Sequence, residues 1–261
     1  MRVKKHIKEK LNIRKQIVME NNELYESDEV VSKYGSFKTR VRQLNIPERE
    51  LIDTFDVCGK DVLILGSGAG RVPANFSLFN NNIYAIELSK KLFEISLSSY
   101  PKSDFKRISF INGDALNLSN LCDRLFDVIF FPMNGIDLLA DFGKQKKLIE
   151  IMSDQLKPNG ILCFTSHNIK AYALSPKLSS NQRSLSNLFK DAVIEEEKVV
   201  GGGVLCKTSQ NHFSKIMSEF KNLRLENYIY DARNKIERRI ALNKFLASLY
   251  FPYVMYVYRK I

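Results

Sequence analysis

Short apolar runs alternate with mixed apolar and polar stretches along the middle of the chain. Each run is short enough to be a buried strand, and each ends at a glycine, an acid or a turn. We expect helices in the stretches between them, near residues 70–80, 89–99 and 143–156. Strands that alternate with helices predict an α/β domain with a mainly parallel sheet. The runs that predict its strands are residues 62–65, 83–87, 108–115, 126–134 and 157–166.

The last third of the chain continues this pattern after an interruption. Residues 208–221 predict a helix and residues 223–230 a sixth strand, and Val254–Tyr258 predicts a seventh. Residues 169–206 fit neither pattern, because they are rich in Ser, Asn and Lys and contain Gly201, Gly202 and Gly203. We interpret them as an insertion that is either part of an acceptor pocket or lid, or a loose surface loop.

The first 56 residues precede the first strand and are mostly helical in pattern. Residues 1–24 place Val3, Ile7, Leu11 and Val18 on one stripe, with lysines opposite. Such a helix fits against the domain or a partner subunit, or lies on a membrane surface. We therefore divide the chain into an N-terminal helical extension or cap (1–56) and a larger domain (57–261) that carries the insertion at 169–206.

A glycine-rich loop follows the first strand directly. Residues 66–70 read GSGAG, so that Gly66, Gly68 and Gly70 alternate with small residues. Alternating glycines suit a turn that bends under a ligand, because they leave no side chain in its way. The pattern G-x-G-x-G differs from the dinucleotide pattern, whose third small residue would fall at Arg71. This spacing disfavours a nicotinamide-dependent oxidoreductase.

Acids follow the second and third strands. Glu87 ends the second run, beside the first loop in a βαβ unit, where it can accept both hydroxyls of a ribose. Alternatively, Glu87 is a surface residue that opens the next helix, with Ser89 as its cap. Asp114 ends the third run and can accept a bond from an exocyclic amine, while Ala115 offers a backbone N–H. Alternatively, Asp114 belongs to an ordinary turn.

These motifs together resemble the class I S-adenosylmethionine-dependent methyltransferases. The resemblance covers roughly residues 57–168 and the tail, and includes the FDVIFF segment and the turn at Leu156–Gly160. It implies a Rossmann-like, seven-stranded, mostly parallel sheet with an antiparallel last strand between strands five and six, and helices on both faces. It also implies S-adenosyl-L-methionine as the cofactor. The family often has an acid where this chain has Ile64.

The resemblance assigns residues to each part of the cofactor. The glycine loop wraps the methionine part, Glu87 binds the ribose, and the Gly113-Asp114-Ala115 segment holds the adenine. The residues that we assign to the cofactor are Gly66, Ser67, Gly68, Gly70, Glu87, Leu88, Asp114, Ala115 and Pro132.

The reaction also requires groups that hold and deprotonate an acceptor. His167 follows the fifth strand, and a histidine suits a general base near neutral pH. A histidine bonded into the pocket wall is the alternative. Asn134 after the fourth strand and Asn168 after the fifth are candidates for orienting the acceptor, and Tyr34 and Arg40 are candidates for covering the site.

Composition and charge bear on the class of molecule that accepts the methyl group. The formal net charge is +11, and the excess lies at the ends: residues 1–20 carry net +5 and residues 215–261 net +6. Basic ends can attract nucleic acid, but the fourth strand lacks the Asn/Asp-Pro-Pro-aromatic signature of many base-methylating enzymes. We therefore expect transfer to an O or N atom of a small molecule. RNA methylation and a non-catalytic cofactor-binding scaffold are the alternatives.

The cysteines and histidines bear on disulfides, cellular compartment and metal binding. The four cysteines are far apart, which predicts buried free thiols in a reducing cytoplasm. The three histidines show no metal-ligand spacing, so we expect no metal. We see no signal peptide and no transmembrane run, and the oligomeric state is open.

Overall fold

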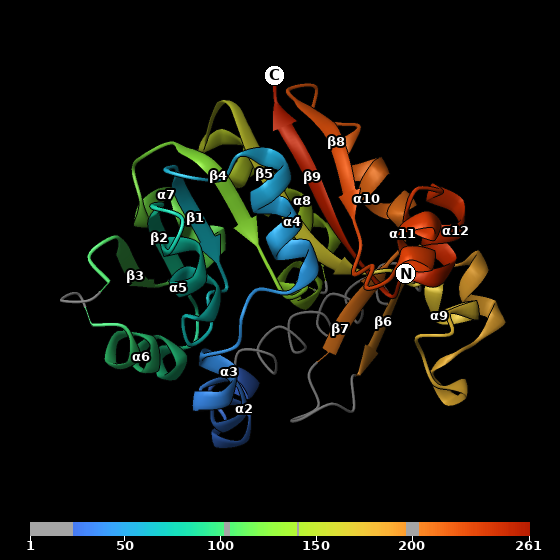
Figure 1. Cartoon of the computed structure of the whole chain (residues 1–261), viewed down its shortest axis with the longest axis horizontal. Helices are drawn as coiled ribbons and strands as arrows, with labels where there is room; N and C mark the ends of the chain where they lie inside the picture. Colours follow the sequence, from blue (N-terminus) through green and yellow to red (C-terminus); the bar gives the residue numbers. More distant parts are fainter. Residues whose placement is uncertain (1–22, 102–104, 140, 197–203) are drawn as a thin grey trace, which may run out of the picture.

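One seven-stranded sheet forms the centre of the protein. The computed structural model describes residues 23–101, 105–139, 141–196 and 204–261. The predicted helix at residues 1–24 and the glycines at 201–203 therefore lie almost wholly outside the described residues. Figure 1 shows the sheet with helices on both sides. In spatial order its strands are β3 (Ile108–Asn112), β2 (Asn82–Glu87), β1 (Asp61–Leu65), β4 (Phe126–Phe131), β5 (Leu156–His167), β9 (Tyr253–Lys260) and β8 (Leu223–Ile229).

The strand directions confirm the predicted fold class. Strands β3, β2, β1, β4 and β5 pair in parallel, whereas β9 pairs antiparallel with both β5 and β8. The last strand of the chain therefore lies between the fifth and sixth strands of the sheet, as expected. This arrangement puts the carboxyl ends of the five parallel strands at one edge, where open α/β sheets bind ligands.

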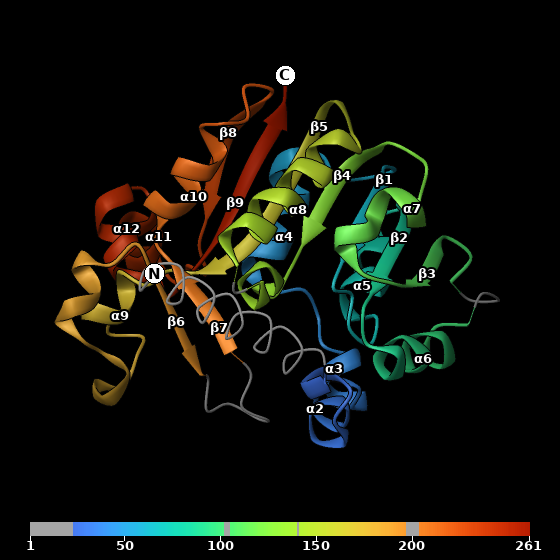
Figure 2. The same cartoon turned by 180° about the vertical axis from the view of Figure 1, so that it is seen from behind.

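Alternation along the strands explains why helices cover both faces. In β1, Val62 and Ile64 join one buried cluster and Leu63 and Leu65 join the other, because successive side chains of a strand point to opposite faces. Helices α4 (Ile46–Phe55) and α5 (Arg71–Ser77) contribute to the first cluster. Helices α8 (Phe142–Asp154) and α10 (Gln210–Met217) contribute to the second, and Figure 2 shows them across the sheet from α4.

The described N-terminal section docks beside α6 (Lys90–Ser99). It contains α2 (Asp28–Tyr34) and α3 (Phe37–Arg40). The Ser89 hydroxyl donates to the Tyr25 carbonyl at 3.0 Å, and the Tyr100 hydroxyl donates to the Arg40 carbonyl at 3.0 Å. These bonds hold the section against the same edge of the sheet that carries the glycine loop.

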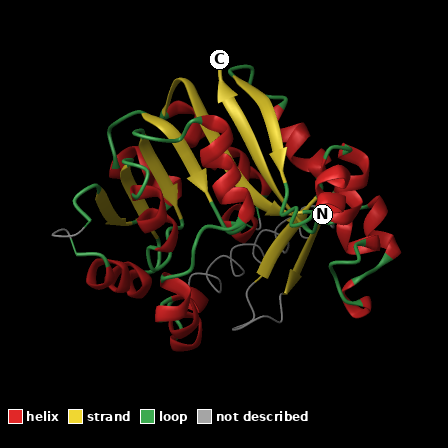
Figure 3. Cartoon of the chain, viewed as in Figure 1, coloured by secondary structure: helices red, strands yellow, loops and turns green. Residues whose placement is uncertain are grey.

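The segment expected as an insertion has regular structure where it is described. It contains α9 (Ala171–Leu174), short 3-10 turns η3 (Ser180–Gln182) and η4 (Leu185–Phe189), and strand β6 (Ala192–Glu196). Strand β6 pairs antiparallel with β7 (Val204–Thr208), so the pair runs two residues beyond the expected boundary at 206. Figure 3 shows this pair apart from the main sheet.

The remaining elements are short and complete the layers. They are η1 (Ala115–Asn117), α7 (Leu118–Leu121), η2 (Gly135–Leu138), α11 (Lys235–Ala241) and α12 (Lys244–Tyr250). No helix within the described residues is long and apolar enough to cross a membrane.

All four cysteines are free thiols, but only Cys163 and Cys206 are buried. The prediction of buried thiols was wrong for Cys58, which is exposed, and for Cys122, which is half-buried.

Candidate functional site

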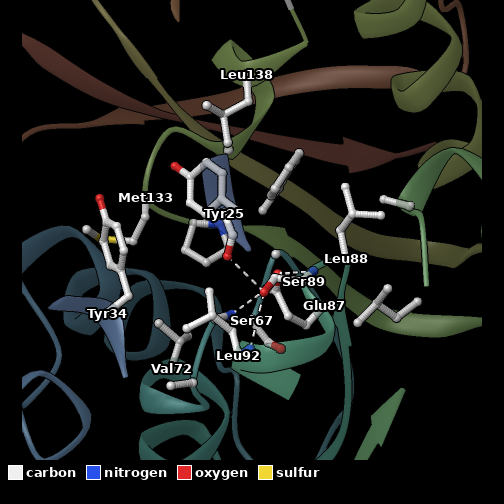
Figure 4. Close-up of a pocket in the computed structure, with 18 of the residues that line it drawn as sticks. Tyr25, Tyr34, Ser67, Val72, Glu87, Leu88, Ser89, Leu92, Met133 and Leu138 are labelled. Carbon is white, nitrogen blue, oxygen red and sulfur yellow. Dashed lines mark hydrogen bonds between the residues drawn. The ribbon is translucent and has the colours of Figure 1, made fainter. Parts of the chain in front are cut away.

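A cavity of about 690 Å³ opens at the carboxyl ends of β1, β2, β3 and β4. Its wall is formed by these strand ends and by the N-terminal section, which is distant in sequence from most of them. Figure 4 shows Tyr25 and Tyr34 from that section around the same space as Ser67, Glu87 and Met133. Eight of the nine residues assigned to the cofactor line it: Gly66, Ser67, Gly68, Glu87, Leu88, Asp114, Ala115 and Pro132.

The ninth residue, Gly70, is not among the lining residues and has a packing role. Its φ of +90° is a left-handed conformation, and a Cβ there would lie 2.6 Å from the Tyr100 ring. A Cβ on Gly66 would likewise lie 2.9 Å from the Phe131 ring. Of the three loop glycines, Gly68 alone would carry a Cβ that meets nothing within 4 Å. Gly66 and Gly70 therefore make room for aromatic rings of the protein, and Gly66 and Gly68 also line the cavity.

Ser67 presents an unsatisfied hydroxyl at this loop. The residue is 6% exposed, and its Oγ has no hydrogen-bond partner among the described residues. A buried hydroxyl without a partner is costly, and a polar ligand in the cavity relieves that cost. The loop thus offers both a polar group and the open space beside Gly68, and it fits a polar cofactor.

Glu87 is buried and braces the loop. Its Oε2 accepts a hydrogen bond from the Gly68 N–H at 2.6 Å, and its Oε1 accepts one from the Ser89 N–H at 2.9 Å. Burial raises the pKa of the Glu87 carboxyl above its usual value, and these backbone bonds oppose the rise. The alternative of a surface glutamate is wrong, since Glu87 is 7% exposed, although Ser89 does cap α6 by accepting from the Leu92 N–H.

The two other strand ends complete the floor of the cavity. Asp114 caps the short turn η1, where its Oδ1 accepts from the Leu116 N–H at 2.9 Å. This is the turn role that its sequence context also allowed, and it fixes the carboxylate on the cavity wall. Leu88 is 47% exposed beside Glu87, and Pro132 follows β4. Acidic and apolar groups thus meet as they do in sites for nucleosides.

The two N-terminal candidates, Tyr34 and Arg40, have different surroundings. Tyr34 lines the cavity, and its ring stacks on Tyr25 with 6.1 Å between centroids. Arg40 does not line it: its guanidinium donates to the Gly35 carbonyl at 3.0 Å and to the Ser99 hydroxyl at 2.5 Å. Arg40 therefore ties the N-terminal section to α6, while Tyr34 faces the ligand space.

His167 pairs with an acid that the sequence analysis missed. Its Nδ1 lies 2.7 Å from Asp137 Oδ2, and Asp137 Oδ1 accepts from the Ser166 hydroxyl at 2.6 Å. Both residues are buried, and neither lines the 690 Å³ cavity, although Leu138 next to Asp137 does. Burial raises the pKa of the Asp137 carboxyl, and the bonds from His167 and Ser166 oppose that rise.

The two asparagine candidates lie away from the cavity wall. Asn134 has a left-handed backbone with a φ of +58°, and its N–H donates to the Thr165 hydroxyl at 2.7 Å. The Asn168 amide donates to the carbonyls of Ser248 and Phe251 at 2.7 and 2.9 Å. Asn134 therefore shapes the turn after β4, and the Asn168 amide holds the end of α12.

Four further residues at the site have little or no local sequence signal. Tyr25 and Met133 line the cavity, and Glu48 forms a buried ion pair with Arg71, 2.6 Å between Oε1 and Nη2. This pair joins α4 to the residue directly after the glycine loop. Asp137 had one weak signal, as the only charged residue between Gly135 and Leu139. Within the described residues, no group of three or more His, Cys, Asp or Glu could hold a metal ion.

Comparisons with known proteins agree with this geometry. The family model described as "Methyltransferase domain" matches residues 57–223. Among solved structures, the CcbJ methyltransferase from Streptomyces caelestis is similar with a TM-score of 0.64 and 14% identity, over 89% of this chain and 96% of that one. An S-adenosylmethionine-dependent methyltransferase from Clostridium acetobutylicum ATCC 824 gives 0.60 and 15%, over 82% and 89%.

A third structure is similar at the same level. The glycopeptide N-methyltransferase MtfA, complexed with S-adenosyl-L-homocysteine, gives a TM-score of 0.61 and 15% identity, over 90% of this chain and 99% of that one. A comparison with curated protein sequences gave no match.

Proposed function

The chain belongs to the methyltransferase domain family, and we propose that it moves a methyl group to an oxygen or nitrogen atom of a small-molecule acceptor. It is an enzyme, and its cofactor is S-adenosyl-L-methionine. That cofactor supplies a methyl group already activated by a sulfonium, so the protein must bind it, align the acceptor and take up a proton where the acceptor carries one.

The cavity residues divide this work among them. In the proposal, Ser67 and the backbone of Gly68 face the methionine part, where the unsatisfied Ser67 hydroxyl finds a partner. Glu87 accepts the ribose hydroxyls while it keeps its bonds to the loop. Asp114 and the Ala115 backbone face the adenine from the turn that caps β3.

The observation that favours a small acceptor is the roof over the cavity. Residues of the N-terminal section, among them Tyr25, Tyr34 and Asn45, line the same 690 Å³ space as the glycine loop. A volume of this size is typical of small-molecule sites. A bulky duplex or folded RNA needs an open, basic face instead, where many phosphates can be contacted. The similar fold of an N-methyltransferase that acts on a glycopeptide also supports the proposal.

His167 is the proposed general base, and Asp137 positions it. In the proposal, Nδ1–H donates a hydrogen bond to the Asp137 carboxylate, which leaves the lone pair on Nε2 to accept a proton. Asn134 is proposed to act through the backbone turn that places Met133 on the cavity wall.

Methyl labelling of size-fractionated cell extract tests the acceptor. The wild type should transfer label from S-adenosyl-L-methionine into the low-molecular-weight fraction. The Glu87→Ala variant serves as the matched control and should transfer little. Label that appears in RNA and vanishes after ribonuclease treatment would overturn the small-molecule proposal.

A further inference from the structure

A second hollow lies at the other end of the molecule from the N-terminal section. This groove, of about 730 Å³, is bordered by α9, η4, the start of α10 and α12, and shares no lining residue with the cofactor cavity. Figures 1 and 2 agree that α9, α11 and α12 gather at one end, far from α2 and α3. Its apolar wall is formed by Leu174, Leu188, Phe245 and Leu249.

Large apolar side chains stand exposed in and beside this groove. Phe245 in its wall is 70% exposed and Leu174 is 46% exposed. Phe189 follows the lining residue Leu188 and is 88% exposed, and Leu242, just before α12, is 89% exposed. A single exposed leucine is ordinary, but several around one hollow mark a surface that contacts something apolar. We call the groove and these four residues the α12 face.

The charges on the α12 face have one sign. Lys170 and Lys244 line the groove, and none of its lining residues is acidic. The carboxylate nearest to it by contact is Asp191, which accepts from the groove residue Ser209 at 3.2 Å. Asp191 pairs with Lys215 at 2.7 Å, and the bond from Lys215 together with the nearby charge of Lys170 lowers the pKa of Asp191. One carboxylate among Lys170, Lys215 and Lys244 leaves the net charge positive. Apolar side chains between cations match a surface that is itself both anionic and apolar.

We propose that the α12 face docks the protein on the surface of an anionic lipid membrane. Phe245, Leu242 and Phe189 enter the boundary between headgroups and acyl chains, and Lys170 and Lys244 contact the anionic headgroups. This is attachment from one side, beyond methyl transfer itself, and it leaves the cofactor cavity at the opposite end of the sheet free.

Other occupants fit the same observations less well. RNA is contacted by cations and stacking rings and gives no reason for exposed Leu174 and Leu242. A second copy of the chain in a two-fold dimer sets the same lysines against each other. Residues 1–20 carry a net charge of +5, so they do not complement a basic groove.

Vesicle co-sedimentation with the full chain tests the proposal. The wild type should pellet with phosphatidylcholine vesicles containing about one third phosphatidylglycerol and remain in the supernatant with pure phosphatidylcholine. Leu242→Ser/Phe245→Ser should lower the partition coefficient by at least about 10-fold, because two side chains no longer insert. Lys170→Glu/Lys244→Glu should lower it by about 25-fold or more, at about 5-fold for each lysine lost.

Matched substitutions elsewhere control for general loss of hydrophobicity or charge. Leu78→Ser/Leu125→Ser removes two exposed leucines that are 75% and 47% exposed on other elements. Lys106→Glu/Lys221→Glu makes the same change of charge away from the groove. The Leu78/Leu125 control should sediment like the wild type, and the Lys106/Lys221 control should stay within a few-fold of it. All variants should bind S-adenosyl-L-homocysteine normally, which shows that they are folded.

Three results would overturn the proposal. The first is that the wild-type protein stays in the supernatant with anionic vesicles, or that the α12-face variants sediment as well as their control variants. The second is tight RNA binding in a filter assay that only the lysine variant loses. The third is a wild-type dimer in light scattering that Leu242→Ser/Phe245→Ser converts to a monomer, without any vesicle binding.

Discussion

One carboxylate oxygen of Asp137 contacts both the backbone and the ring of His167. Its Oδ2 accepts the backbone N–H of His167 at 2.8 Å and lies 2.7 Å from the ring Nδ1. The same carboxylate accepts the Ser166 hydroxyl through Oδ1, so Asp137 is satisfied on both oxygens. An acid that holds both the backbone and the ring of a histidine fixes the direction of the ring and the position of its proton.

Replacement of either partner should slow methyl transfer. His167→Asn removes the proposed base and should lower the rate by about 10²–10⁴-fold. Asp137→Asn keeps an oxygen that can accept from the His167 N–H and Nδ1, but it removes the negative charge that stabilises the protonated ring, so a smaller fall in rate is expected. Single-turnover kinetics over a pH series measure both effects, and the wild-type profile should lose a limb in His167→Asn.

Cofactor affinity and folding separate a chemical role from a structural one. Both variants should bind S-adenosyl-L-homocysteine within a few-fold of the wild type, because the glycine loop and Glu87 lie on other strands. Thermal melting must accompany the kinetics, since Asp137 is buried. Near-normal turnover in a folded His167→Asn variant would make His167 a wall residue.

Removal of the Glu87 carboxylate should weaken cofactor binding. Glu87→Ala loses the proposed ribose bonds and also releases the Gly68 N–H, so we expect a loss of about 1–3 kcal/mol. Titration calorimetry with S-adenosyl-L-homocysteine measures it. Glu94→Ala, an exposed acid on α6, is the control and should bind normally. Equal affinities for the two variants would remove Glu87 from the site.

Glu87 should also make stability depend on pH in the absence of cofactor. Burial raises its pKa in the folded state, so its stabilising contribution is complete below the unfolded pKa and is lost as pH rises through the folded pKa. Glu87→Gln carries no charge and avoids that loss. Its melting temperature relative to wild type should therefore rise between pH 4 and pH 8.

Differential scanning calorimetry resolves this effect, because 1 kcal/mol corresponds to about 2–4 °C in a domain of this size. Glu94→Gln, at an exposed position on α6, is the matched control for the substitution itself. A Glu87→Gln difference that is constant or falls with pH would show that the bonds from Gly68 and Ser89 outweigh the burial.

The loop glycines should respond differently to alanine. Gly70→Ala places a methyl group 2.6 Å from the Tyr100 ring at a φ of +90°, and should destabilise the protein by about 2–4 kcal/mol. Gly68→Ala meets no protein atom within 4 Å, so its strain costs only about 1–2 kcal/mol. Because Gly68 lines the cavity, we expect the added methyl group to hinder the cofactor. Denaturant titration and calorimetry of cofactor binding together should show one stability variant and one binding variant.

Local patterns were sufficient to predict the sheet and to bring most of the residues assigned to the cofactor to one cavity. The apolar runs placed the strands, and the chain order of GSGAG, Glu87 and Asp114 placed three loops at one edge. This works because parallel strands joined by helices bring their carboxyl ends together, so position along the chain predicts position in space. Eight of nine assigned residues accordingly reached one cavity.

Tertiary structure alone decided which partner each residue meets. Asp137 and His167 are 30 positions apart in the sequence. Gly70 and the Tyr100 ring, which leaves no room for a Cβ at Gly70, are also 30 positions apart. No local pattern encodes such pairs, because they depend on how helices and loops pack over the strand ends. The roof formed by Tyr25 and Tyr34, and the exposed α12 face, likewise arise from segments distant in sequence. The sequence therefore determined the sheet and the order of its ligand-binding loops, while packing decided the roof, the acid behind the histidine and the reason for each glycine.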